Sequence, residues 1–598
     1  MLKHEKVILL AILFLGAFVR FWGLDFCLLL GREGWVFLSL CRVDEELTWA
    51  VALRFFSGDF NPHFFNYPTL LPYAVFVLDA IFLAGKLLFT ANGSLESLKQ
   101  SIAMNPSDLI LLSRGVVALL GTLTLLCVYK IAAKLFGKKE GLLSAFFLAF
   151  AYLHVRDSHF ATTDVPMTFM ACLAYLFIID IFQKGRWQDY LLAGIFSGLA
   201  ASTKWPAFLL FIPILTAHFL SPSPSGNSRN GIKLAVGLLV MLAAIILGTP
   251  FAVLSFPEFW QEMQRLNQTH AQTGWRGIRL GIGWLYHFKF TLWHGLGWPL
   301  FLASLGGIGI ALKKNRKAAL LLLSFVLPYY FLIGKQYLVF MRYMVPLVPF
   351  CCVFAGVFAS SFFVILRPKA EPWRRRRQDL IGFDKPSLGC KPRGEESQRS
   401  FVASLLRMTS VLLGILSLLI VFPSLYHVFW LDQALAKPDS RIAASDWINQ
   451  NIPQGKKLVL LSLIMGDPAI DIPRSTIGDP YWARRFEWPP RFLNAKLQEP
   501  PYHYFRILPE TYWRSKDLLD KAQYDYLIVD HSSLPARSVT KEVLQDLMVR
   551  FNLVKVFPGA GEDPRMIFDP QDGFYLPIDG AQHTERPGPD IYIFRPKS

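Results

Sequence analysis

The sequence predicts an all-α polytopic membrane protein that ends in a small α/β domain. Long apolar runs recur between residue 5 and about residue 424, and 53% of the 598 residues are hydrophobic. Only 18% of the residues carry a charge, whereas a soluble globular chain carries about 25%. The mean hydropathy of +0.36 agrees with a chain that lies largely in a lipid bilayer. Beyond residue 424 the composition changes to a mixture of polar and apolar residues.

About eleven transmembrane helices account for the apolar runs, and the basic loops between them set their direction. The expected spans are residues 5–24, 108–135, 140–155, 165–183, 188–203, 205–220, 232–250, 293–312, 318–333, 343–366 and 401–424. Lysine and arginine concentrate in the loops on one side of these spans, as they do in the cytoplasmic loops of membrane proteins. We therefore expect a cytoplasmic N-terminus, a membrane module over residues 1–424 and an extracytoplasmic domain over residues 425–598.

The apolar stretch Leu70–Leu88 lies in a large first outer loop, residues 25–107, and its placement decides the topology. It is apolar enough to span a membrane, but it contains Asp79 and Lys86. Counting it as a span would move every later basic loop to the outer side, against the usual charge bias. We therefore expect a juxtamembrane or re-entrant helix within the outer loop.

The formal net charge of +17 is explained by the loops rather than by a nucleic-acid partner. Residues 367–399 include four consecutive arginines, Arg374–Arg377, and are expected to form a disordered basic loop in the cytoplasm. No other feature of the chain indicates nucleic-acid binding, so the expected partners are the lipid bilayer and molecules that reach its outer face.

Residues 425–598 carry local patterns of a small α/β domain. Ser440–Asn451 has apolar residues on one helical face, which predicts an amphipathic helix. Lys457–Leu463 and Tyr526–Asp530 are short apolar runs, which predicts buried strands. The segment contains no glycine-rich phosphate loop and no hydrolase or metalloprotease motif, so we expect no catalytic motif in this domain.

Three acids and two cations on the predicted outer face are the residues most typical of a functional site. Asp44 and Glu45 follow the first span, Asp164 begins a later one, and Arg114 and Lys204 lie at outer helix ends. Charges at a membrane edge are costly unless they are solvated, paired or functional. Helix capping by the acids and snorkelling by the cations are the alternatives. Gathered on one surface, these residues suit a phosphate-bearing lipid substrate.

Cysteines and histidines give no firm metal signature. Cys27 and Cys41 share the outer loop, where they form a disulfide or stay free according to the redox compartment. Six histidines fall near the outer face: His63, His154, His159, His270, His287 and His294. A metal held by histidine with Asp157 or Asp164 is conceivable, but no pair has diagnostic ligand spacing. We therefore expect no required cofactor, while a divalent metal remains an open alternative.

The order of short motifs along residues 5–350 resembles the GT-C membrane glycosyltransferases of the protein O-mannosyltransferase and lipid A aminoarabinose transferase type. The motifs are Val43–Glu45, Gly58–His63, Tyr67–Pro68, Ser113–Arg114, Val128–Tyr129, Lys134–Gly137, Ser158–Pro166, Gly198–Lys204 and Arg342–Pro349. The chain departs from the aminoarabinose transferases at Asn66–Tyr67, where they carry a Glu-Lys pair, so the resemblance does not imply aminoarabinose as the donor sugar. Residues 26–41 are an additional piece before the first acids.

The resemblance implies an inverting transferase that moves a sugar from a polyprenyl-phosphate donor to a hydroxyl acceptor at the outer face of the inner (plasma) membrane. Carried over to this chain, it makes Asp44, with Glu45 beside it, and Asp164 the catalytic acids, and it turns Arg114 toward the donor phosphate. Lys204 is a second expected phosphate contact. Further expected substrate contacts are His63, Tyr67, His159 and Arg342.

The chemistry of such a transfer fits these residue types independently. A hydroxyl needs a base as it attacks the anomeric carbon, and a partly desolvated carboxylate such as Asp44 suits that role. The leaving phosphate needs cations to stabilise its growing charge.

Two other functions stay open at this point. A transporter or flippase for a lipid-linked sugar would favour inverted repeats and polar residues at mid-membrane, and the sequence shows neither. A non-catalytic assembly protein would use the outer domain as its binding module.

Overall fold

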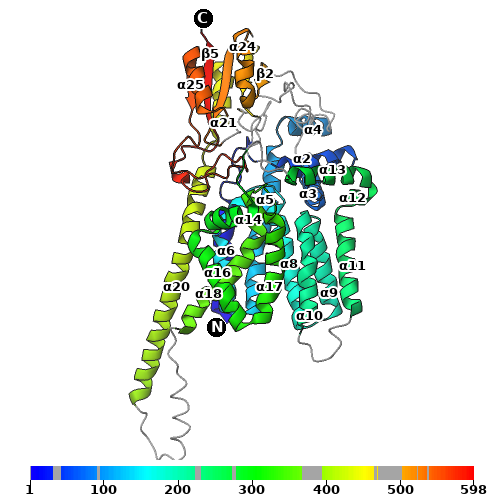
Figure 1. Cartoon of the computed structure of the whole chain (residues 1–598), viewed down its shortest axis with the longest axis vertical. Helices are drawn as coiled ribbons and strands as arrows, with labels where there is room; N and C mark the ends of the chain where they lie inside the picture. Colours follow the sequence, from blue (N-terminus) through cyan, green and yellow to red (C-terminus); the bar gives the residue numbers. More distant parts are fainter. Residues whose placement is uncertain are drawn as a thin grey trace, which may run out of the picture.

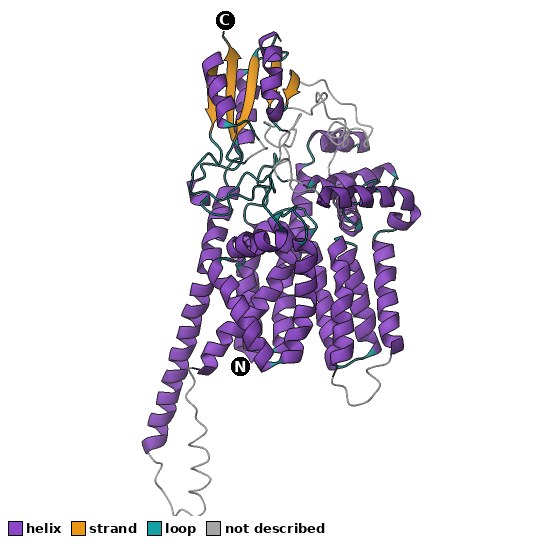
Figure 2. Cartoon of the chain, viewed as in Figure 1, coloured by secondary structure: helices purple, strands orange, loops and turns teal. Residues whose placement is uncertain are grey.

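A helical bundle with a small mixed domain at one end makes up the chain (Figure 1). The computed structural model describes residues 2–30, 42, 44–89, 94–221, 231–271, 278–365, 393–463, 468, 502–521, 523–534 and 538–597. Strands occur at one end of the molecule, and loops lie between them and the bundle (Figure 2). Most of the basic loop expected over residues 367–399 falls outside the described residues.

Each of the eleven predicted spans is helical in the structure. The corresponding helices are α1 (Leu2–Phe21), α5 (Ser107–Leu135), α6 (Lys138–Ala149), α8 (Asp164–Gln183), α9 (Trp187–Ala201), α10 (Phe211–Leu220), α11 (Gly231–Gly248), α16 (Trp298–Lys314), α17 (Arg316–Gly334), α18 (Val348–Ile365) and α20 (Arg393–Leu435). In the described part, seven helical stretches, or eight with one bent pair, are long and apolar enough to cross a membrane. Because α6, α9 and α10 are shorter and α1 carries several charges, the count of eleven stays a prediction.

Twelve further helices connect these spans in the described part of the chain. They are α2 (Glu46–Arg54), η1 (Phe55–Ser57), α3 (Leu70–Phe89), α4 (Leu95–Met104), α7 (Tyr152–Asp157), η2 (Trp205–Leu210), α12 (Phe251–Leu254), α13 (Phe256–Ala271), α14 (Gly283–Tyr286), η4 (His287–Thr291), α15 (Leu292–Leu296) and η5 (Met341–Leu347). In Figure 1, α2, α3, α12 and α13 lie beyond the upper ends of α9, α10 and α11.

Small residues let neighbouring helices approach closely, as is usual in membrane bundles. On α9, a Cβ added at Gly194 would lie 2.3 Å from the carbonyl oxygen of Gly237 on α11. One added at Gly198 would lie 2.4 Å from the carbonyl oxygen of Met241. Alanine at either glycine would therefore push the two helices apart.

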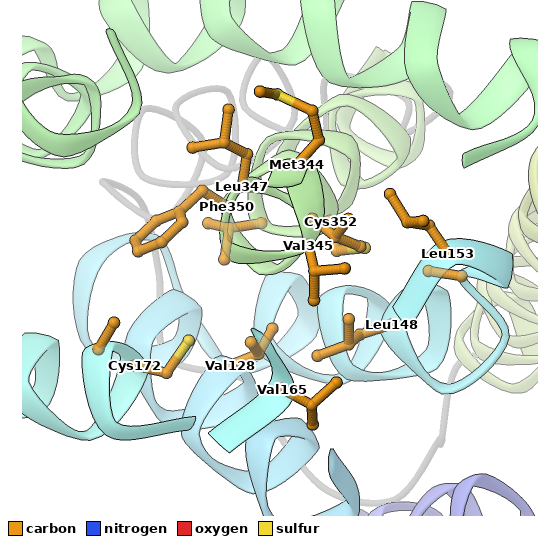
Figure 3. Close-up of a cluster of buried hydrophobic side chains, with 14 of the residues drawn as sticks. Val128, Leu148, Leu153, Val165, Cys172, Met344, Val345, Leu347, Phe350 and Cys352 are labelled. Atoms are coloured by element: carbon orange, nitrogen blue, oxygen red, sulfur yellow. The ribbon is translucent and has the colours of Figure 1, made fainter. Parts of the chain in front are cut away.

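A large apolar cluster fills the centre of the bundle. Val345 of η5 lies among Val128 of α5, Leu148 of α6 and Val165 of α8 (Figure 3). Val165 follows directly after Asp164 in the chain, so this packing fixes the start of α8 and the carboxylate that it carries.

Lysines from three of the predicted basic loops, Lys134, Lys184 and Lys314, lie at one end of the bundle, called here the basic end. Lys134 and Lys184 both pair with Asp180, at 2.9 Å and 3.0 Å. Lys314 pairs with Glu140 at 2.6 Å, which joins the last turn of α16 to the first turn of α6. The opposite end, at the start of α5 and α8, is called the site end.

Helix α3 has both of its ends at the site end. The amide of Leu70 donates to the carbonyl of Ser202, just after α9, at 3.1 Å. At its other end, Lys86 pairs with Asp108 in the first turn of α5. A 20-residue helix is about 30 Å long, so a spanning helix would have its ends on opposite faces. Although α3 passes the test of length and composition, its contacts support the expected juxtamembrane helix.

The C-terminal domain is a five-stranded sheet with helices on its faces. The strands are β1 (Lys457–Leu461), β2 (His503–Ile507), β3 (Tyr526–His531), β4 (Phe551–Phe557) and β5 (Asp590–Pro596), in the order β2-β1-β3-β5-β4. β2, β1 and β3 are parallel, while β5 is antiparallel to β3 and β4. Three helices pack on the sheet: α21 (Ser440–Asn451), α24 (Tyr512–Lys521) and α25 (Lys541–Arg550).

After Lys457, strand β1 is apolar because both of its faces are covered. Leu458 and Leu460 join the cluster that contains residues of α21, while Val459 and Leu461 join the cluster that contains residues of α24 and α25. The predictions of a helix at Ser440–Asn451 and of strands beginning at Lys457 and Tyr526 are confirmed. Helix α20 continues to Leu435, so the expected domain border at residue 425 falls inside this helix.

The connection between β4 and β5, residues 558–589, returns from the domain to the bundle and is called here the docking segment. Its side chains Phe574, Leu576 and Ile578 are buried in the same apolar cluster as the cores of α5 and α8. The sequence does not predict this contact, because the segment has no helical or strand periodicity.

Candidate active site at the site end of the bundle

Asp44 lies on the turn before α2 with its carboxylate turned toward the bundle. One oxygen accepts hydrogen bonds from the Tyr67 hydroxyl at 3.2 Å and from the Arg342 guanidinium at 2.5 Å. Its φ of 72° is in the left-handed region, which few non-glycine residues adopt and which recurs at functional sites. Capping does not explain this residue, because its side chain bonds to Tyr67 and Arg342 rather than to helix amides.

Glu45 is buried beside Asp44 and holds a different cation. Its two carboxylate oxygens accept bidentate bonds from the Nε and Nη2 of Arg114, at 2.8 Å and 2.7 Å. The Ala161 amide donates a third bond at 2.8 Å. The remaining guanidinium nitrogen of Arg114 donates to the carbonyls of Leu24 and Phe26. This pair therefore fastens the outer loop to α5 and to the segment before α8.

Asp164 is the first residue of α8, where the helix dipole favours a carboxylate. It accepts a hydrogen bond from the Lys204 amine at 2.5 Å. Burial lowers the pKa of Lys204 from its usual value, and the carboxylate of Asp164 opposes that shift. The amine also lies 4.9 Å from the ring centroid of Tyr343 and 5.6 Å from that of Tyr67.

A small pocket brings these groups together. Its lining is Asp44, Leu47, Thr48, Tyr67, Thr162, Thr163, Asp164 and Arg342. Burial, reinforced by Asp44, raises the pKa of the Tyr67 phenol well above its ordinary value, so it stays a donor. The Thr162 hydroxyl is buried and finds no hydrogen-bond partner among the described residues. The pocket thus combines two carboxylates, a guanidinium and hydroxyl groups at the ends of helices.

Behind the pocket, three buried arginines surround a single carboxylate from the docking segment. Asp572 pairs with Arg42 at 2.7 Å, with Arg342 at 2.8 Å and with Arg156 at 3.3 Å. Asp157 adds a second acid, 3.0 Å from Arg156 and 3.6 Å from Arg42. Burial alone would raise the pKa of Asp572, but the three guanidinium groups outweigh it and hold this pKa below its usual range.

The predicted site residues separate into three groups. Asp44, Tyr67, Asp164 and Arg342 line the pocket, and Lys204 pairs with one of them. Glu45 and Arg114 form the buried pair beside it. His63 and His159 are not among the lining residues.

The two histidines are occupied elsewhere. His63 bonds Asp59 at 3.0 Å and Glu258 at 2.8 Å on an exposed part of the outer loop. His159 is fully buried, with its ring nitrogens bonded to the carbonyls of Val155 and Trp22.

A metal site finds no ligand set in the part of the chain that the structure describes. No group of three histidine, cysteine, aspartate or glutamate side chains there is close enough to hold an ion. Asp44 and Asp164 are paired with Arg342 and Lys204. These positive charges would repel a metal ion. Cys27 is disulfide-bonded, and Cys41, its expected partner, lies outside the described residues.

Sequence reasoning missed Arg42, Arg156 and Asp572. The two arginines stand next to recognised acids in the chain, at Arg42–Asp44 and Arg156–Asp157, and this adjacency was a usable signal. Asp572 offers only a turn-like Asp-Pro-Gln-Asp-Gly pattern at residues 569–573. Nothing local links that turn to the helices.

Comparison with known proteins supports the resemblance for part of the chain. Residues 101–252 match the family model described as dolichyl-phosphate-mannose-protein mannosyltransferase. An uncharacterized protein of Aquifex aeolicus (strain VF5) is 31% identical over 126 residues, which is 21% of this chain and 25% of that protein's length. The resemblance of this chain to polyprenyl-phosphate-dependent membrane glycosyltransferases is thereby confirmed over residues 101–252, which include Arg114, Asp164 and Lys204.

Two solved structures are also similar to this chain at low identity. The oligosaccharyltransferase AglB of Archaeoglobus fulgidus, in complex with an inhibitory peptide and a dolichol-phosphate, has a TM-score of 0.49 and 13% identity. The alignment covers 88% of this chain and 69% of AglB. ArnT of Cupriavidus metallidurans, bound to undecaprenyl phosphate, has a TM-score of 0.48 and 15% identity, with 93% of this chain and 97% of ArnT covered. Both TM-scores lie below 0.5, so neither likeness establishes the fold.

Proposed function

We propose that the chain is an inverting membrane glycosyltransferase, which moves a sugar from a polyprenyl-phosphate donor to a hydroxyl acceptor. The observation that carries the proposal is the pocket in which Asp44 faces Arg342 beside the Asp164–Lys204 pair. The family match over residues 101–252 covers one wall of this pocket and supports the same reading.

Asp44 is the proposed general base. The acceptor oxygen attacks the anomeric carbon, its proton passes to the Asp44 carboxylate, and the bond from that carbon to the phosphate oxygen breaks. The products are the glycosylated acceptor and the polyprenyl phosphate. Arg342 now occupies one oxygen of Asp44, and a donor phosphate that competes for this guanidinium would free the carboxylate to accept the proton. Thr162 offers its hydroxyl to the bound sugar.

Arg342 and Lys204 are the proposed cations for the leaving phosphate. Arg342 lines the pocket, and the Lys204 amine contacts Asp164 in its wall. Preorganised cations that meet a developing negative charge are commonly the largest single term in catalysis. The contacts of Arg114 argue for a different role, since its guanidinium is taken by Glu45 and two carbonyls.

We infer that the site end faces away from the cytoplasm. The basic loops lie at the other end of the bundle, as cytoplasmic loops do. The disulfide of Cys27, in the outer loop, is typical of an oxidising compartment. This orientation gives an inner-membrane protein with a cytoplasmic N-terminus and an extracytoplasmic C-terminal domain.

The test uses the full chain in proteoliposomes with a panel of radiolabelled polyprenyl-phosphate monosaccharides. Mannose is the first sugar, because the family model names it, and membranes of cells that lack the chain supply the acceptors. We expect label to move from the donor to an acceptor and polyprenyl phosphate to be released. Movement of intact lipid-linked sugar across the bilayer, without transfer, would instead favour the transporter alternative.

A further inference from the structure

The C-terminal domain contributes a side chain to the surroundings of the pocket. Asp572 is 1% exposed and lies within the docking segment, between β4 and β5. It contacts Arg342 through one guanidinium nitrogen, while the other nitrogen of the same group contacts Asp44. Arg342 is therefore a bridge between the proposed base and the C-terminal domain.

Neighbours of Asp572 fix the segment against the residues directly before Arg342. The Val339 amide donates to the side-chain oxygen of Gln571 at 2.8 Å. The Met341 amide donates to the carboxylate of Asp569 at 2.9 Å. The docking segment thus holds the backbone directly before Arg342 as well as its side chain.

Aromatic packing completes the attachment. Phe574 packs against Phe160 at a ring-centroid distance of 4.9 Å and against Phe26 at 6.1 Å. The guanidinium of Arg42 lies over the rings of Phe160 and Phe574, at 4.7 Å and 5.4 Å. Because these contacts belong to the main apolar cluster, the segment is part of the bundle's core rather than a loosely attached cover.

We propose that Asp572 is a positioning residue of the transferase site, which acts through Arg342 to set the place and the charge environment of Asp44. The proposal rests on the proposed function and extends it to the C-terminal domain.

The charges around Arg342 explain the effect. Arg42, Arg156 and Arg342 are matched by Asp44, Asp157 and Asp572. Without the carboxylate of Asp572, three buried cations would share two acids, and leaving a buried charge uncompensated is costly. Arg342 would then be drawn more tightly to Asp44, which would make that carboxylate a poorer base and less free to meet an acceptor.

A different reading would make Asp572 a stand-in for the donor phosphate that leaves when the donor binds. The burial of Gln571, Phe574 and Leu576 argues against easy departure of the segment. The two readings predict different kinetic effects. If Asp572 mimics the donor phosphate, its loss raises the affinity for the donor. If Asp572 is a positioning residue, its loss lowers kcat.

The test compares D572N with D572E and with D563N in the full-length protein. Asp563 is the matched control, because it lies on the same segment and pairs with its near neighbour Arg565 rather than with the bundle's arginines. For D572N we expect kcat to fall about 10- to 100-fold. The KM for the donor should not fall, because its phosphate must compete with a tighter Arg342–Asp44 pair. D572E, which restores the charge, should recover part of kcat, and D563N should match the wild type. Binding of undecaprenyl phosphate, followed by native mass spectrometry, should persist in D572N.

An unchanged kcat in D572N, or a lower KM for the donor with an undiminished kcat, would overturn the proposal. If D572N does not fold, D572E decides alone: a reduced kcat at an unchanged melting temperature supports positioning, and a wild-type kcat refutes it. The outcome is separable from the proposed function. A wild-type protein without transfer activity removes the function itself, whereas an inactive D44N beside a fully active D572N removes only the role of Asp572.

Discussion

Asp44 and Glu45 are adjacent in the chain, yet they serve two different regions of the molecule. Glu45 accepts three hydrogen bonds, and its side chain is 6% exposed. Asp44 is 19% exposed, lines a pocket and shares its cation with Asp572. The comparison shows that an ion pair alone does not identify a functional-site residue. The difference lies in whether the pair still has a free side that a substrate can reach.

The largest effect is expected at the Asp44–Arg342 pair, which lines the pocket. Asp44→Asn keeps the size of the side chain but cannot accept the acceptor's proton, so transfer should fall about 100- to 10,000-fold. The amount and melting temperature of the purified protein should stay near those of the wild type. Asp25→Asn, which alters an exposed acid in the same outer loop, is the control. Full activity in Asp44→Asn would remove this residue from the chemistry.

At the buried Glu45–Arg114 pair, the expected effect is on the stability of the folded protein. Glu45→Gln leaves Arg114 as a buried cation without its counter-ion, and breaking such a pair costs about 3–5 kcal/mol. We expect a lower melting temperature and less folded protein, with normal turnover per folded molecule. Glu96→Gln, on the exposed face of α4, is the control. A stable but inactive Glu45→Gln would show that Glu45 takes part in catalysis beside Asp44.

A milder change at the same pair separates its two suggested roles. Arg114→Lys keeps the charge and loses the bidentate geometry, which should cost about 1–3 kcal/mol of stability. The KM for the donor should not move, because Glu45 and backbone carbonyls occupy the guanidinium. Thermal melting and donor titration in parallel would measure both quantities. A raised KM at unchanged stability would return Arg114 to the phosphate site.

The smallest effect concerns the pH dependence of docking. Burial, and then the charge of Asp572, raises the pKa of Asp569 to about 6. A raised pKa in the folded state means that the docked segment prefers the protonated acid. Docking should therefore be firmest near pH 4 and weaken as the pH rises through about 6.

Hydrogen exchange of the docking segment at pH 5 and pH 7.5 would measure this dependence. Asp569→Asn should weaken the difference between the two pH values, since the amide does not titrate. An unaltered pH dependence in that variant would assign the effect to another group.

Much of the bundle could be predicted because its signals are local. Apolar runs and basic loops located the eleven helical segments. An apolar helical face predicted Ser440–Asn451, and short apolar runs predicted the first and third strands. The pocket residues Asp44, Asp164 and Arg342 were found because each stands in a short motif at a helix end.

The remainder depends on contacts between segments far apart in the chain. Local sequence cannot reveal that Arg114 forms an ion pair with Glu45. Nor can it reveal that Asp572 pairs with three arginines of the bundle. Two partners of His63 and His159, Glu258 and the carbonyl of Trp22, lie far away in the sequence, so these contacts could not be predicted from it. Such pairings are decided by packing rather than by periodicity.

Asp572 follows every helix of the bundle in the chain, and this order bears on how the protein is made. The helices of the bundle are synthesised before the docking segment. Until that segment is made, Arg42, Arg156 and Arg342 therefore lack their ion pairs with Asp572. The pocket gains its full set of charges only after the C-terminal domain has been synthesised and the docking segment has packed against the bundle. A nascent or truncated chain would carry every residue of the pocket and still lack the one that balances it.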